Sequence, residues 1–140
     1  MVELTFKPDP FHPNIYIMDN IQHLGPDSVH IHLSIRTPIW RPPTDVFETD
    51  EAVIVRSEIA GMAEAEFSIV LDGRYLVVRG VRADIAERRS YHQMEIMFGD
   101  FVVEVELPCP VDSERAQAIY LNGFLRIELP KVKPRQVQIE

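Results

Sequence analysis

The feature that most constrains the fold is a series of short β-strand patterns separated by glycine turns. Asn122-Gly123 and Asp72-Gly73 each stand between two runs rich in Val, Ile, Leu and aromatic residues. Asn-Gly and Asp-Gly between such runs are strong signals of β-hairpin turns. The strand-like runs are residues 45–47, 52–59, 66–71, 75–79, 90–98, 100–107, 117–121 and 124–129. Roughly seven or eight short strands at this spacing predict an all-β, immunoglobulin-like antiparallel β-sandwich.

Prolines divide the chain into three parts. We expect a flexible N-terminal arm over 1–41, a β-sandwich domain over 42–132 and a short C-terminal extension over 133–140. In the arm, Asn14–Leu24 is long enough for a short helix, and Val29–Ile35 alternates like a strand. Within the domain, 62–66 is compatible with one helical turn, and a second short helix can begin at 112–115 with Asp112 or Ser113 as its cap.

The arm is apolar for an irregular segment. Such a segment without its own core must bury its side chains on another subunit or on a client protein. The residues that we expect to bind clients are Phe6, Phe11, Ile15, Tyr16, Ile17 and Trp40. For Trp40, as for Tyr120, ordinary packing within the domain is the stronger interpretation against a ligand platform.

The last residues form an alternating pattern, Val137-Gln138-Ile139. In an extended strand, Val137 and Ile139 project to the same side, about 7 Å apart. Such a segment can bury both side chains by adding a strand to an exposed sheet edge. Taken alone, the pattern favours a frayed terminus. The motifs in the rest of the chain favour a docking segment instead.

The composition excludes several partners. The net charge of −8 argues against nucleic acid as a partner, because phosphate binding needs clustered Lys and Arg. No apolar run is long enough for a membrane span, and the first residues do not resemble a signal peptide. We therefore expect no stable membrane insertion and a cytoplasmic protein. The single cysteine, Cys109, lies between two prolines, where we expect a half-buried thiol in a turn.

No pattern indicates catalysis. The chain has no glycine-rich phosphate loop, and its carboxylates show no acid–base spacing. His30 and His32 share a strand face, but a third metal ligand cannot be placed. The histidines are His12, His23, His30, His32 and His92. We predict no enzyme activity, no cofactor, no metal and no small-molecule substrate.

Several motifs, in order, resemble the small heat-shock protein family, whose members contain an α-crystallin domain. The resemblance covers roughly 100 residues, and the ordered set is specific although each motif alone is weak. The motifs are Pro43–Asp50, Ile59-Ala60-Gly61-Met62 with Ala60 in place of the usual proline, Leu76–Gly80, Tyr91 with Phe98-Gly99-Asp100-Phe101, Ala118–Leu125, Leu129-Pro130-Lys131 and Val137-Gln138-Ile139.

The resemblance implies an ATP-independent holdase of the stress response, which binds partly unfolded client proteins and prevents their aggregation. It also implies a homodimer that assembles into higher homo-oligomers. Dimers would form by strand exchange between Ala83, Asp84, Ile85 and Ala86 of one subunit and Thr44, Asp45, Val46 and Phe47 of the other.

The same resemblance implies that Val137 and Ile139 dock in a groove on another subunit. The strand 117–121 is apolar on both faces, and only one face can be core. We expect Ala118 and Tyr120 to be core. The expected groove residues are Ile119 and Leu121, with Ile69 or Val70 and Leu71.

Two positions depart from the family pattern. Ile96 and Val103 replace arginines that commonly support the dimer interface. Two alternative functions stay open. One is a co-chaperone adaptor of the related CS type. Such an adaptor would not contain both the tail motif and the Asn-Gly signature. The other is an enzyme or ligand-binding sandwich, which would need polar loops clustered at one end.

Overall fold

Nine strands and one short 3-10 helix form within the residues that the computed structural model describes, which are 2–8, 16–23, 39–62 and 67–133. The elements are β1 (Val2–Pro8), β2 (Tyr16–His23), β3 (Thr44–Glu48), β4 (Ala52–Glu58), β5 (Ser68–Asp72), β6 (Tyr75–Arg82), β7 (Gly99–Glu106), η1 (Ser113–Arg115), β8 (Gln117–Leu121) and β9 (Phe124–Pro130).

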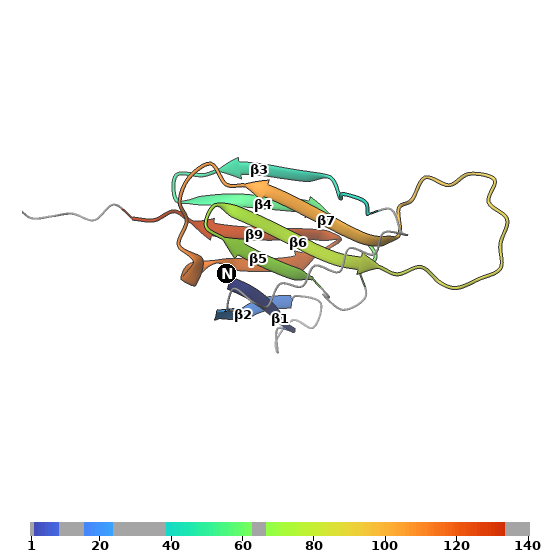
Figure 1. The fold of residues 1–140 in the computed structure, drawn as a ribbon, viewed down its shortest axis with the longest axis horizontal. Coiled ribbons are helices and arrows are strands. Elements are labelled where there is room, and N and C mark those ends of the chain that lie inside the picture. The colour runs from blue at the N-terminus through green and yellow to red at the C-terminus, as the bar shows by residue number, and fades with distance from the viewer. Residues whose placement is uncertain (1, 9–15, 24–38, 63–66, 134–140) are drawn as a thin grey trace, which may run out of the picture.

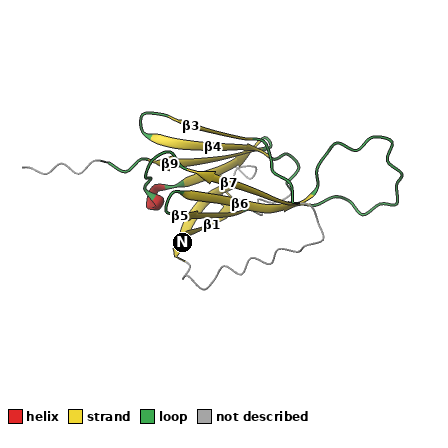
Figure 2. Cartoon of the chain, turned by 45° about the horizontal axis from the view of Figure 1, so that its top comes forward, coloured by secondary structure: helices red, strands yellow, loops and turns green. Residues whose placement is uncertain are grey.

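Two antiparallel layers face each other across the core (Figure 1). One layer has the order β3-β4-β9-β8 and the other has the order β5-β6-β7, while β2 and β1 connect β8 to β5 at one side. Figure 2 shows the two layers turned so that their separation is visible. The predicted all-β sandwich is confirmed.

The core follows from the alternation of apolar and polar residues in the strands. β9 alternates strictly, with Leu125, Ile127 and Leu129 fully buried and the residues between them exposed. In contrast, β4 is buried along most of its length, with only Arg56 and Glu58 exposed. Its one buried polar residue, Ser57, is satisfied by the Thr44 hydroxyl at 2.8 Å.

Both predicted hairpins form, but the turn expected at Asp72-Gly73 is centred one residue later, at Gly73-Arg74. Asn122 and Gly123 both have positive φ, 52° and 81°, which is the backbone of a type I′ hairpin between β8 and β9. In the turn between β5 and β6, Gly73 has a φ of 59° and its neighbour Arg74 does not have a positive φ. That pattern is typical of a type II′ turn, which needs glycine at its first central position.

Two predicted local structures are wrong. The expected helix over Asn14–Leu24 is replaced by strand β2 over Tyr16–His23, because pairing with β1 and β8 fixes an extended backbone. The expected strand over 90–98 is a loop, so Gly99 begins β7 rather than closing a hairpin. Within the described chain, no neighbouring strand forms backbone hydrogen bonds with this loop, and a strand needs such a partner.

The short helix at 113–115 is confirmed, with Asp112 as its N-cap. The Asp112 carboxylate accepts a hydrogen bond of 3.1 Å from the Glu114 amide. The expected strand over 29–35 and most of the turn at 62–66 lie outside the described residues. In the part of the chain that the structure describes, no helix is long and apolar enough to cross a membrane.

Candidate assembly and client-binding surfaces

Strand β3 presents a free backbone edge. Among the described residues it pairs only with β4, on one side, and it stands at the end of the strand order. Val46 is 40% exposed and Phe47 36% exposed, although both are large apolar residues. An open edge with exposed apolar side chains is a template for another strand.

Two arginines of the same layer contact the Phe47 ring. The guanidinium carbons of Arg56 and Arg126 lie 5.5 and 5.9 Å from the ring centroid. Arg56 also donates to the carboxylate of Asp45 at 2.8 Å. These cation–π contacts hold Phe47 across the outer face of the sheet. Neither arginine was singled out from the sequence, because the contact depends on the register between β3, β4 and β9.

A long loop over residues 83–98 projects away from the sandwich, at the right of Figure 1. Its residues are all exposed, and they include the expected exchange segment Ala83–Ala86. Ile85 is 71% exposed. The other large apolar side chains exposed on this loop are Tyr91, Met94, Ile96, Met97 and Phe98. Exposed apolar patches of this kind are typical of interaction surfaces.

Arg82 connects the two ends of this loop. Its Nε donates to the Met97 carbonyl at 2.8 Å, so the residue before the loop holds a residue at its far end. Its guanidinium also lies over the rings of Trp40 and Phe98, at 4.3 and 5.4 Å from the centroids. The sequence contained no signal for this cluster, because its members are far apart along the chain.

Strand β8 has the orientation that was expected. Ala118 and Tyr120 face the core, and the Tyr120 hydroxyl donates to the Ile59 carbonyl at 2.7 Å. Ile119 is half-buried and Leu121 is 40% exposed on the opposite face. Packing is therefore the role of Tyr120, as predicted.

On β5 the expected groove residues lie on two different faces of the strand. Val70 is half-buried, whereas Ile69 and Leu71 are buried in the core cluster. The strand pleat explains this, since residues two apart share a face and Ile69 and Leu71 both face the other layer. Of the expected groove residues, Val70, Ile119 and Leu121 lie at least partly outside the core.

The N-terminal hairpin lies between these two strands. β1 pairs with β5 through Val2–Leu4, and β2 pairs with β8 through Tyr16 and Ile17. Phe6 lies in β1 opposite Met18. Of the expected client-binding residues, Phe6, Tyr16 and Ile17 thus belong to a paired hairpin, while Phe11 and Ile15 lie outside the described residues.

Comparison with known proteins identifies the fold. The model of the Hsp20/alpha crystallin family matches residues 45–140. The chain belongs to this family. The small heat shock protein C2 of Rickettsia felis is 28% identical over 104 residues, which are 71% of this chain and 68% of that protein. The spore protein SP21 of Stigmatella aurantiaca is 32% identical over 107 residues, 73% of this chain and 63% of that protein.

Solved structures agree with this membership. Heat shock protein 16.0 from Schizosaccharomyces pombe is 26% identical with a TM-score of 0.59, covering 71% of this chain and 98% of that chain. HspA from Xanthomonas axonopodis is 25% identical with a TM-score of 0.62, covering 67% and 96%. The shared region is the α-crystallin sandwich.

Within this family's fold, Trp40 proves to be a core residue. It is 7% exposed, its ring lies 5.5 Å from that of Phe101, and its Nε1 donates to the Gly99 carbonyl at 3.2 Å. Its backbone also bonds to Asp100 and Val102 of β7. This burial favours the packing interpretation for Trp40.

The two departures from the family pattern differ in their surroundings. Val103 is fully buried in β7 opposite Val78, so this position strengthens the core and cannot contribute an interfacial charge. Ile96 is 65% exposed on the 83–98 loop, where it adds apolar surface instead of charge. Val137 and Ile139 lie outside the described residues.

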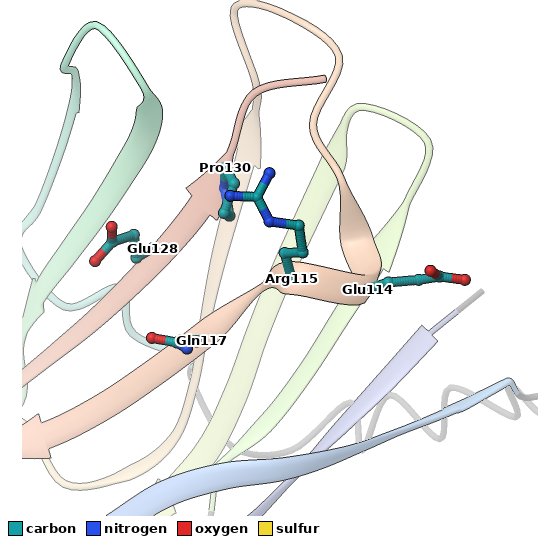
Figure 3. Close-up of a pocket in the computed structure, with 5 residues that line it drawn as sticks. All are labelled: Glu114, Arg115, Gln117, Glu128 and Pro130. Carbon is teal, nitrogen blue, oxygen red and sulfur yellow. The ribbon is translucent and has the colours of Figure 1, made fainter. Parts of the chain in front are cut away.

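A hollow lies beside η1 in the described part of the chain. The hollow beside η1 is lined by Glu114, Arg115, Gln117, Glu128 and Pro130, and Figure 3 shows Glu114 pointing away from the other four. This is an open depression of mixed charge. Among the described residues, no cluster of His, Cys, Asp and Glu is suited to hold a metal ion.

Near the start of the C-terminal extension, Lys131 forms an ion pair with Glu48 at 3.0 Å. The hydrogen bond to Glu48 raises the pKa of Lys131 above its usual value. The half-buried Cys109 thiol lies 3.8 Å from the same carboxylate. These contacts connect the end of β3 to the residue that follows β9 and to the loop after β7.

Proposed function

We propose that the chain is an ATP-independent molecular chaperone, a holdase that binds partly unfolded proteins and prevents their aggregation. Membership of the Hsp20/alpha crystallin family and relatives named as small heat shock proteins support a chaperone role. Binding rather than catalysis is the proposed activity, with no cofactor or small-molecule substrate. We place this activity in the cytoplasm.

The observation that supports the proposed assembly is that the same chain has both an open strand edge and an exposed apolar loop. Strand β3 has a free edge, and Ile85 on the 83–98 loop is largely exposed. In the proposed dimer, Ala83–Ala86 of each subunit adds to β3 of the other. That exchange would cover Ile85, Val46 and Phe47. It would also satisfy the free backbone N–H and C=O groups of both segments.

The tail provides the proposed contact between dimers. Val137 and Ile139 would add to a sheet edge of another subunit, near Val70, Ile119 and Leu121. Each tail contact is weak, but several acting together within one closed assembly give high overall stability. The arm residues Phe6, Phe11, Ile15, Tyr16 and Ile17 are the proposed client-binding residues when the arm is not paired.

Suppression of aggregation without ATP tests the holdase proposal. A heat-labile enzyme is warmed with increasing amounts of the chain, and light scattering is followed over time. We expect scattering to fall with the molar ratio of chain to client, with no change when ATP is added. An inert protein at the same mass concentration is the control. Unchanged scattering at an excess of chain would contradict the proposal and favour the adaptor alternative.

A further inference from the structure

The β1–β2 hairpin fills the space between the two layers at one side of the sandwich. Val2, Glu3 and Leu4 lie opposite Leu71, Val70 and Ile69. Tyr16 and Ile17 lie opposite Tyr120 and Ile119. All nine strands thereby belong to one sheet, in which β2 and β1 stand between β8 and β5.

These are the edges that the proposed tail docking requires. Glu3 is the partner of Val70, and Ile17 is the partner of Ile119. A strand edge offers a single row of N–H and C=O groups, and one added strand saturates that row. The hairpin of a subunit and the tail of another therefore exclude each other from the same edge.

The segment paired with β5 has the same pattern as the tail. Val2-Glu3-Leu4 and Val137-Gln138-Ile139 are both aliphatic–polar–aliphatic triplets. Residues two apart in an extended chain point to the same side, so both triplets suit the same kind of sheet edge. This similarity supports one site with two alternative occupants from the same sequence.

We propose that the β1–β2 hairpin is an internal competitor of the tail, and that a tail from another subunit docks only when the hairpin leaves β5 and β8. The inference rests on the proposed tail docking and adds the segment that opposes it. Because the hairpin is tethered, it has a high effective concentration at its own domain. Release of the hairpin by an incoming tail frees the arm for clients, which couples assembly to client binding.

A designed disulfide tests the position of the hairpin directly. Directly opposed residues of an antiparallel pair have Cα atoms about 4.5–5.5 Å apart, a separation that a disulfide spans. Glu3→Cys with Val70→Cys, in a Cys109→Ser chain, is expected to form a bond within one chain. Glu3→Cys with Glu104→Cys is the matched control, since Glu104 lies on β7 opposite Val77, and it is expected to stay reduced.

Competition is measured with a peptide of residues 133–140 bearing a fluorophore. The chain carries Val137→Gly and Ile139→Gly so that its own tails leave the edge empty. Glu3→Pro removes an N–H from β1 and disfavours a central strand, so we expect peptide affinity to rise about tenfold or more. Asp50→Pro in the exposed turn between β3 and β4 is the control and is expected to leave the affinity unchanged.

The outcomes separate this inference from the proposed function. Failure of the Glu3–Val70 disulfide to form overturns the inference, even if loss of Val137 and Ile139 still shrinks the assembly. An equal peptide affinity in the oxidised and reduced disulfide variant, or in Glu3→Pro and its parent, also overturns it. If the peptide binds none of these chains, tail docking itself is wrong and the competition is wrong with it.

Discussion

The guanidinium of Arg82 lies 4.3 Å from the centroid of the Trp40 ring, and this contact connects three parts of the molecule. Trp40 stands where the arm enters the domain, and it bonds through its backbone to β7. Arg82 ends β6 and also donates to the carbonyls of Met97 and Ala60. Trp40, the far end of the 83–98 loop and the segment that follows β4 therefore all contact one side chain.

Replacing this arginine is expected to loosen the base of the loop. Arg82→Met should lower the free energy of unfolding by about 1–2 kcal/mol, because it removes cation–π and hydrogen-bond contacts. Urea unfolding followed by the fluorescence of Trp40, the single tryptophan, measures this change. Arg82→Lys should recover only part of the loss, because lysine lacks the planar fork.

Arg79→Met is the matched control for this experiment. Arg79 lies on the same strand and is half-buried, but it makes none of the contacts made by Arg82. We expect little change in stability for this variant. Equal losses for Arg79→Met and Arg82→Met would show that the loop base is not held by Arg82.

The glycine turns and the alternating runs were sufficient to predict the sandwich. Asn122-Gly123 specifies a hairpin through its own backbone preference, and β9 shows its buried face in its alternation. The family motifs lie in this part of the chain, so the domain and the family were both accessible from the sequence. The core face of β8 was also predicted, because only one side of an apolar strand can face the other layer.

The arm was less predictable for a physical reason. Tyr16–His23 has a pattern compatible with a helix, and its strand conformation follows from partners about a hundred residues away, at β8. The loop at 90–98 shows the opposite case, since its alternating sequence favours a strand that has no partner within the described chain. Both errors arise because strand formation depends on a partner that a local pattern does not contain.

The turn at Gly123 should tolerate alanine less well than the turn at Gly73. Both glycines have positive φ, so alanine costs about 1–2 kcal/mol at either site. At Gly123 a Cβ would also lie 3.2 Å from the Cβ of Ala60, whereas nothing lies within 4 Å at Gly73. We expect Gly123→Ala to be the more destabilising by about 1 kcal/mol or more in urea unfolding. Equal losses would contradict the role of the Ala60 contact.

A charge on the 83–98 loop should weaken the proposed dimer without weakening the domain. Ile85 is 71% exposed in the single chain, so Ile85→Asp removes little core packing. In the dimer its burial would contribute about 1.5–3 kcal/mol, and its replacement should raise the dissociation constant at least about tenfold. Sedimentation velocity at several concentrations measures this constant.

Tyr75→Asp supplies the control for the loop variant. Tyr75 is 59% exposed at the far end of β6 from the loop, so the same charge is added to an exposed apolar site. Its dimer dissociation constant is expected to match that of the parent chain. If Ile85→Asp and Tyr75→Asp dimerise equally well, the loop does not form the proposed interface.

Loss of the two tail residues should reduce the size of the assembly. Burying Val137 and Ile139 together is worth about 3–5 kcal/mol before ordering costs, and the effect multiplies when several tails hold one closed assembly. Val137→Gly with Ile139→Gly is therefore expected to shift the mass, measured by light scattering, towards that of the dimer. Gln136→Gly with Gln138→Gly changes the same number of neighbouring residues and the same backbone freedom, but keeps the aliphatic pair. A parent-sized assembly in the first variant, or an equal loss of mass in both, would refute specific docking by Val137 and Ile139.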